Sequence, residues 1–160
     1  MTEPWAVVIG VGNDYRSDDG IGWAVAIQIE KLHIPGVLVT LSDGEPTGVA
    51  DLWACMDLAV VIDAVRREPL VPGRVRSGDL DLLQHTGTAA SSHTLGIRDA
   101  LPLGRAVGRV PGRIVVIAVD AACLDLGVGL SEPVAAAVPH AVDAVITELC
   151  RAEPTNRVRR

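Results

Sequence analysis

The feature that most constrains the fold is a set of four unbroken apolar runs, at residues 5–9 (WAVVI), 37–41 (VLVTL), 58–62 (LAVVI) and 114–119 (IVVIAV). They do not alternate apolar with polar residues, as a strand with one face in water would. Continuous runs of this length are typical of strands buried on both faces, as in a parallel sheet. Because helices must cover both faces of such a sheet, the runs predict an α/β domain.

Helical patterns fill the intervals between these runs, at residues 21–32, 47–56, 92–104 and 131–150. In the last of them Ser131 is placed to cap the start of the helix. Residues 73–79 (GRVRSGD) alternate among glycines and charges, which predicts an exposed edge strand that can run antiparallel. The expected fold is a three-layer, doubly wound domain, with helices on both faces of a mostly parallel, twisted sheet of about five strands.

The length of 160 residues favours a single domain, which we expect over residues 1–150. The segment 151–160 (RAEPTNRVRR) is polar, and we expect a frayed tail there. No apolar run approaches the roughly 20 residues that span a bilayer. We therefore expect no membrane segment, and the short acidic N-terminus does not resemble a signal peptide.

Charge and cysteine content narrow the classes of partner. The net charge is −6, and no basic stripe precedes the tail, which argues against a nucleic-acid partner. The three cysteines, Cys55, Cys123 and Cys150, are scattered and form no CxxC motif. They indicate reduced, buried thiols in a cytoplasmic protein rather than a disulfide framework or a thiolate metal site.

Acidic residues follow each main run: Asp18 and Asp19 after the first, Asp43 after the second, Asp63 after the third and Asp120 after the fourth. In an open parallel sheet, ligands bind beyond the carboxyl ends of the strands. The predicted sheet therefore presents several carboxylates at its functional edge.

A nucleotide enzyme is the least favoured class for this edge. The turn GVGNDY lacks the third glycine of GxGxxG, there is no GxxxxGK[ST] loop, and carboxylates repel phosphate. A divalent cation fits better, since carboxylates with the imidazole of His93 form an oxygen and nitrogen donor set suited to Zn, Ni, Mn or Fe. Asp63 ends a buried run, where an unpaired charge is costly.

Each of these residues also has a structural interpretation. His93 alone can be an ordinary packed histidine. Asp18 and Asp19 can act as helix-start acids, a role worth about 0.3–1 kcal/mol, and one of the two is expected to do only that. Asp43, beside Gly44, can be a simple turn residue.

At these residues the sequence resembles the hydrogenase maturation endopeptidases, which trim the C-terminal extension from the large subunit of [NiFe] hydrogenases after nickel insertion. Four elements carry the resemblance, in order within residues 5–150: IGVGNDYRSDDGIG, VVIDAV, SSHTLGI and GLSEPV. The resemblance implies an endopeptidase whose partner is the immature large subunit. It also implies that the nickel arrives with that substrate.

The resemblance assigns site roles residue by residue. The metal-binding and catalytic positions fall on Asp19, Asp63 and His93. The segment SDGEPTG places Asp43, Gly44, Thr47 and Gly48 where the family handles its substrate, while Glu45–Pro46 departs from the family's glycine-rich pattern.

Two mechanisms stay open at this point. The metal can act as a Lewis acid, or it can serve as a recognition handle while Asp18 or Asp43 acts as general base. A different class, a non-catalytic module that binds a metal or small ligand on the same fold, is the alternative. Such a module is expected to enclose an apolar pocket.

Overall fold

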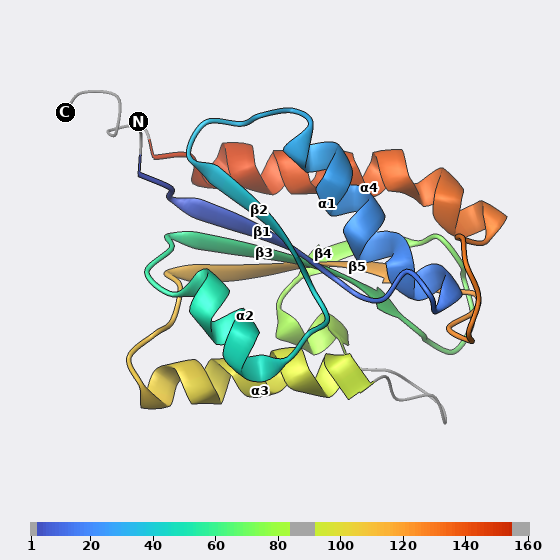
Figure 1. The fold of residues 1–160 in the computed structure, drawn as a ribbon. Coiled ribbons are helices and arrows are strands. Elements are labelled where there is room, and N and C mark those ends of the chain that lie inside the picture. The colour runs from blue at the N-terminus through green and yellow to red at the C-terminus, as the bar shows by residue number, and fades with distance from the viewer. Residues whose placement is uncertain (1–2, 84–91, 155–160) are drawn as a thin grey trace.

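The structure is a computed structural model that describes residues 3–83 and 92–154, and for residues 92–96 it describes the backbone only. Its five strands form one sheet in the order β2-β1-β3-β5-β4, with β4 antiparallel to β5 and the other pairs parallel (Figure 1). The strands are β1 Ala6–Val11, β2 Val37–Ser42, β3 Leu58–Val65, β4 Val75–Gly78 and β5 Arg113–Asp120. The predicted strands and the antiparallel edge are confirmed.

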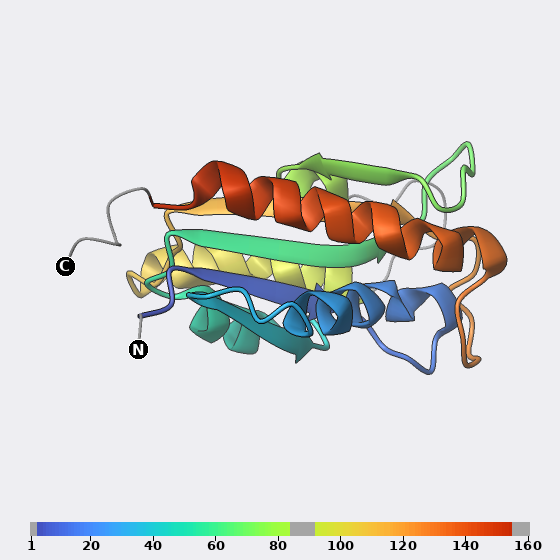
Figure 2. The ribbon, with the colours of Figure 1, turned by 90° about the horizontal axis from the view of Figure 1, so that it is seen from above.

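Helices cover both faces of this sheet. They are α1 Ile21–Glu30, α2 Pro46–Trp53, α3 Ser92–Ala106 and α4 Glu132–Ala152, with short 3-10 helices η1 Ser17–Gly20 and η2 Leu80–Leu83. Figure 1 shows α1 and α4 on one face and α2 and α3 on the other. Seen from above, α1 and α4 lie along the strands (Figure 2). The three-layer arrangement is confirmed.

The apolar runs that form β1, β3 and most of β5 are buried on both sides, as their composition predicts. The run that forms β2 is an exception, because β2 is an edge strand and none of its residues is buried. Every residue of β1 and β3 is buried. Alternate residues contribute to two cores, with Val8 and Ile62 facing α1 and α4, and Ile9 and Val61 facing α2 and α3. The few aromatic residues contribute Trp53, which is fully buried in the second core.

The helix α4 is long and apolar enough to cross a membrane by length and composition alone. In the fold it packs against α1 and β5 and buries Val134, Ala141, Val145 and Leu149 in the first core. The helix therefore packs one apolar face on the sheet, and the rest of its surface stays wholly or partly exposed. The helix continues to Ala152, two residues into the segment expected to be a frayed tail.

The order of the strands creates a switch point between β1 and β3. From β1 the chain crosses to β2 on one side, and it then returns to form β3 on the other side. Loops that leave neighbouring strands in opposite directions open a crevice at the carboxyl ends of the strands. The start of α1 packs closely against the ends of β1 and β3, and only a glycine fits there. A Cβ on Gly22 would overlap the carbonyl oxygen of Val11 and lie 2.6 Å from that of Ile62.

Candidate functional site

Two of the predicted ligands are buried carboxylates at the switch point. Asp19 lies in η1, directly after β1, and is 2% exposed. Asp63 lies in β3 and is fully buried, and its Oδ1 accepts a hydrogen bond of 2.8 Å from the Ala64 N–H. The elements η1 and β3 are in contact. The structure therefore brings the two carboxylates to neighbouring elements at one edge of the sheet.

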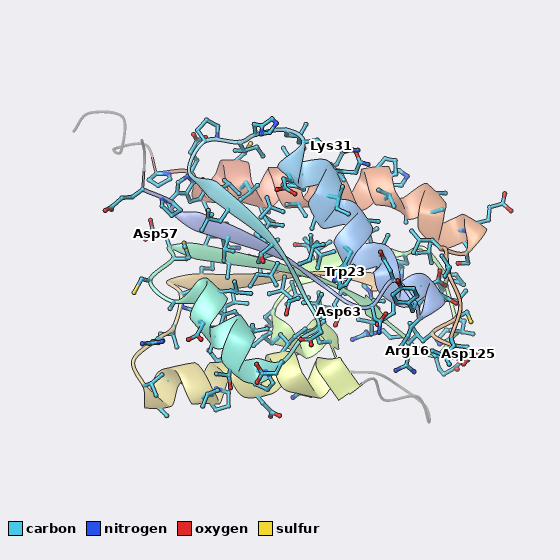
Figure 3. The ribbon with its side chains drawn as sticks, viewed as in Figure 1. Arg16, Trp23, Lys31, Asp57, Asp63 and Asp125 are labelled. Atoms are coloured by element: carbon cyan, nitrogen blue, oxygen red, sulfur yellow. The ribbon has the colours of Figure 1, made fainter. Side chains whose placement is uncertain are left out.

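The labelled side chains make this edge visible. Asp63, Trp23 and Arg16 lie on the side of the molecule toward which β1 and β3 point, whereas Asp57, just before β3, lies at the opposite end (Figure 3). Gly12, with φ of +153°, passes so close to Asp19 that a Cβ on it would overlap the Asp19 carbonyl oxygen. This glycine of the GVG turn thus makes room for the Asp19 backbone, which gives it a packing role.

His93 lies in the first turn of α3, and its side chain is outside the described part of the structure. The last residue of α3, Ala106, is joined by a short segment to the start of β5. The Ser92 end of the helix is therefore at the opposite edge, where β1 and β3 end (Figure 1). Among the described side chains no three His, Cys, Asp or Glu residues form a metal-binding group. The set of Asp19, Asp63 and His93 stays a prediction.

Asp18 has a larger structural role than the expected helix-start effect. It is fully buried, and its Oδ2 accepts hydrogen bonds from the N–H groups of Ala122 (2.8 Å) and Cys123 (2.9 Å). The Ser131 N–H donates to its Oδ1 at 2.7 Å, and the Ser131 hydroxyl donates to Oδ2 at 2.9 Å. Both oxygens are thus engaged within the fold, which removes Asp18 as a candidate general base.

Those bonds join the loop after β1 to the loop after β5. The Ser17 N–H donates to the Gly127 carbonyl and the Gly127 N–H donates to the Tyr15 carbonyl, each at 2.9 Å. Ser131 stands at the N-cap position of α4, as predicted, but its side chain makes no capping bond to that helix. The GLS element therefore braces η1, the segment that carries Asp19.

The segment that follows β2 forms a turn and a helix start. Asp43 is exposed, and its Oδ1 accepts from the Glu45 N–H at 3.0 Å, as the turn interpretation predicts. Glu45 caps α2, since its carboxylate accepts from the N–H groups of Thr47 (2.9 Å) and Gly48 (2.7 Å). These bonds, first to Gly48 and then to Thr47, lower the pKa of the Glu45 carboxyl below its usual value of 4.5.

The departure at Glu45–Pro46 is thereby explained. Glu45 is the N-cap residue, and Pro46 begins α2 at a position where a missing N–H is harmless. Substrate binding by Asp43, Gly44, Thr47 and Gly48 stays a prediction, and Thr47 and Gly48 already donate their N–H groups to Glu45.

Asp120, the acid after the fourth run, belongs to an ion-pair group. It is 1% exposed, and its Oδ1 lies 2.6 Å from Nη2 of Arg76, while its Oδ2 lies 3.5 Å from Nε of Arg74. Neither partner was predicted from the sequence, although two arginines at alternate positions of the predicted edge strand, residues 73–79, were the available signal. Asp120 and Asp18 therefore stabilise the fold, and neither is needed as a ligand.

Comparisons with known proteins agree with this architecture. The sequence model of a family described as hydrogenase maturation protease matches residues 46–148, which include Asp63 and His93. The hydrogenase 2 maturation protease of Escherichia coli K12 is 27% identical over 146 residues, covering 89% of each chain. A putative hydrogenase maturation protease of Methanocaldococcus jannaschii is 27% identical over 151 residues, covering 89% of this chain and 95% of its own.

Solved structures show the same fold. The E. coli hydrogenase maturating endopeptidase HybD superposes with a TM-score of 0.80 at 23% identity, covering 92% of this chain and 93% of its own. The [NiFe] hydrogenase maturation protease HybD of Thermococcus kodakarensis superposes with a TM-score of 0.70 at 25% identity, covering 89% and 97%.

Proposed function

Since this chain belongs to the hydrogenase maturation protease family, we propose that it is the endopeptidase that removes the C-terminal extension from a [NiFe] hydrogenase large-subunit precursor. In this proposal it recognises the inserted nickel through Asp19, Asp63 and His93. Membership in a protease family also argues against the alternative that the chain is a non-catalytic binding module. The relatives are named proteases and endopeptidases, and this chain is an enzyme of that kind.

The observation that carries the proposal is the burial of Asp19 and Asp63 on neighbouring elements at the switch point. Two buried carboxylates repel each other, and a divalent cation between them removes that repulsion. With an imidazole they supply an oxygen and nitrogen donor set. Three ligands leave coordination positions open, which the ligands of the precursor's own metal site can occupy.

Nickel in this scheme is part of the substrate. Holding the ion would place the precursor's scissile bond beside the carboxylates, and that positioning accounts for a large share of the catalytic effect. Of the two candidate general bases, Asp43 is the one we retain. It is exposed beyond the end of β2, whereas both oxygens of Asp18 are engaged within the fold.

We place the reaction in the cytoplasm. The three cysteines are free thiols, but Cys55 and Cys150 are exposed and Cys123 is half-buried, so the expectation that they are buried is wrong. The partner is the immature large subunit, whose nickel is loaded before cleavage.

The test replaces each ligand separately with a near-isosteric amide. Asp19→Asn, Asp63→Asn and His93→Gln are each expected to lower the rate of cleavage of a nickel-loaded precursor by at least about a hundredfold, as loss of a key catalytic contact does. Asp143→Asn, at an exposed position of α4, is the matched control. Cleavage is followed by gel mobility, and thermal unfolding checks the fold. Normal cleavage by all three variants would rule out the metal assignment.

A further inference from the structure

In the described part of the chain, the outer edge of β2 has no strand paired to it. This strand is the last of the sheet, and among the described residues its strand partner is β1. The carbonyl of Gly36 accepts from Trp5, and that of Ser42 accepts from Gly12. In a parallel ladder, successive residues point their N–H and C=O groups alternately to the two sides. Val39 and Leu41 therefore point these groups outward.

Nothing in β2 protects this edge. Its sequence, VLVTLS, has no proline, lysine or other charge, and its pairing with β1 runs from Val37 to Ser42 without a bulge. Soluble proteins usually block such an edge with one of these devices. Two apolar side chains on it, Leu38 and Leu41, are 48% and 42% exposed. The edge thus has the features of a surface that accepts an added strand.

This edge is continuous with the candidate site. β2 ends at Ser42, and Asp43 follows directly. The indole N–H of Trp23 donates to the Ser42 carbonyl at 3.0 Å, which ties the end of β2 to the start of α1 beside Asp19. A peptide lying on the outer edge of β2 therefore arrives at Asp43, at the same end of the sheet as the η1 segment that carries Asp19.

We propose that the C-terminal extension of the precursor binds as an added strand along the outer edge of β2 and runs antiparallel to it. This inference rests on the proposed function. The direction follows from the topology, because β2 runs toward the candidate site. The extension begins at the scissile bond, so a chain that leaves the site along β2 must run the opposite way.

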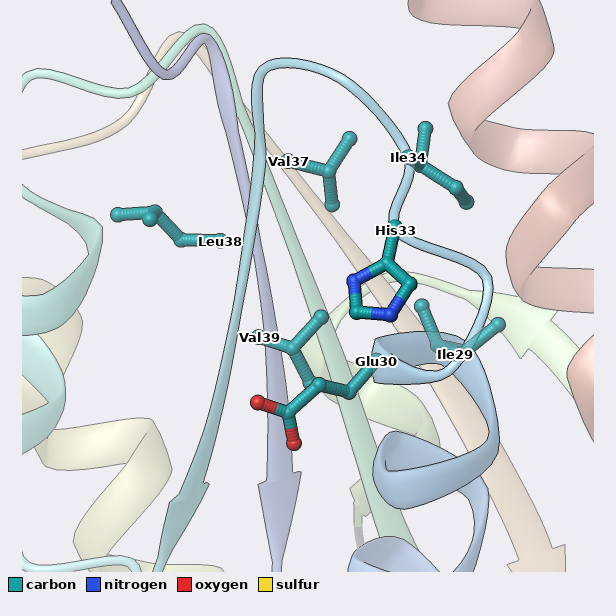
Figure 4. A pocket seen from close by; sticks show the side chains of 7 residues that line it. All are labelled: Ile29, Glu30, His33, Ile34, Val37, Leu38 and Val39. Atoms are coloured by element: carbon teal, nitrogen blue, oxygen red, sulfur yellow. The ribbon is translucent and has the colours of Figure 1, made fainter.

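A cavity of about 260 Å³ lies at the far end of this edge, between β2 and the end of α1. Its lining includes Glu30, His33, Val37, Leu38 and Val39, and Figure 4 shows the Glu30 carboxylate and the His33 ring beside the strand. Charged groups of both signs stand at this end of α1, since Lys31 is its C-cap residue and follows Glu30 directly. At about 3.3 Å per residue, the fourth to sixth residue of the extension reaches this cavity.

The test uses a fluorescein-labelled synthetic peptide that spans the scissile bond and the extension of the precursor. Binding to the intact protease is followed by anisotropy, so the result does not depend on cleavage. Backbone amides of the peptide are N-methylated one at a time. Methylation is expected to weaken binding about three- to tenfold at every second position and much less at the positions between, because only alternate amides face β2.

A variant of the protein gives an independent measurement. Val39→Pro removes the outward N–H and leaves the hydrogen bonds between β2 and β1 intact. Edge strands tolerate proline at positions whose N–H faces away from the sheet. Val39→Ala trims the side chain and keeps the N–H, so the difference between the two variants isolates the N–H. Val39→Pro is expected to weaken binding at least about threefold more than Val39→Ala, with both variants folded by circular dichroism.

Three results would overturn the proposal. They are a flat N-methyl scan, equal binding by the two Val39 variants, and a stable dimer in sedimentation that persists at saturating peptide, since a second copy would then occupy the edge. Failure of the wild-type enzyme to cleave the nickel-loaded precursor would instead count against the proposed function. Cleavage together with a flat scan would retain the function and reject the added strand.

Discussion

Asp18 and Asp19 are chemically identical neighbours with different surroundings. Asp18 is surrounded by donors from the loop after β5, whereas Asp19 lies beside β3 at the switch point. In the sequence, only the family resemblance distinguishes the two. The bonds of Asp18 span more than a hundred residues of chain, from Asp18 to Ala122, Cys123 and Ser131, and no local spacing pattern encodes such contacts.

Asp18→Asn is expected to destabilise the protein by about 2–4 kcal/mol, because an amide NH₂ replaces one of two acceptor oxygens that face buried donors. The free energy of unfolding in urea measures this. Asp14→Asn, at an exposed position of the same loop, is the control and is expected to change the free energy by less than about 0.5 kcal/mol. Equal stability of the two variants would contradict the bracing role of Asp18.

At the scale of elements, β1, β3 and β5 were predictable because burial on both faces leaves a local signal of continuous apolar residues. β2 carries the same signal although none of its residues is buried, so the signal gave the strand but not its exposed position at the edge of the sheet. The predicted helix starts at 21 and 92 agree with α1 and α3. The start of α2 was obscured, because Glu45–Pro46 was seen as a departure from a family pattern rather than as a cap followed by an N1 proline. Contacts between distant loops, which fix the position of η1, could not be inferred from spacing.

The cap of α2 gives a prediction about acid stability. Hydrogen bonds to Gly48 and Thr47 lower the pKa of Glu45 in the folded protein below 4.5. A lowered folded pKa means that the cap stabilises the protein above that value, and that this stabilisation is lost as the pH falls through the folded pKa.

The difference in free energy of unfolding between wild type and Glu45→Gln is therefore expected to be constant near neutral pH and to shrink below about pH 4.5. Urea titrations over this range measure the difference. Glu132→Gln, in the first turn of α4, serves as a control for the loss of one acidic group at a helix start. A difference that grows in acid would contradict the capping role of Glu45.

At the scale of the whole molecule, the topology brings together what the sequence keeps apart. The strand order places the ends of β1 and β3 next to each other. Because the end of α3 connects to the start of β5, the first turn of α3, at Ser92, lies at the same edge of the sheet as those strand ends. Asp19, Asp63 and His93 are thereby carried by three separate elements at one edge. The meeting of their side chains stays a prediction, since the His93 ring lies outside the described residues.

The proposed set of Asp19, Asp63 and His93 predicts how strongly the protease alone binds nickel. Two carboxylates and one imidazole form an incomplete coordination set, so the protease alone is expected to bind nickel weakly and to gain affinity when the precursor supplies the remaining ligands. Isothermal titration of nickel into the protease should therefore give weak binding that Asp63→Asn removes.

Adding nickel either to the protease or to the precursor distinguishes two possibilities. In one the protease recognises a nickel-loaded precursor, and in the other it uses a metal ion of its own. Precursor stripped of nickel by a chelator is expected to stay uncleaved when mixed with protease that was preincubated with nickel and desalted, and to be cleaved after its own nickel is restored. The amount of processed large subunit on a gel is the measurement, with untreated loaded precursor as the control. Cleavage of the stripped precursor at the control rate would show that the protease does not distinguish a nickel-free precursor from a nickel-loaded one.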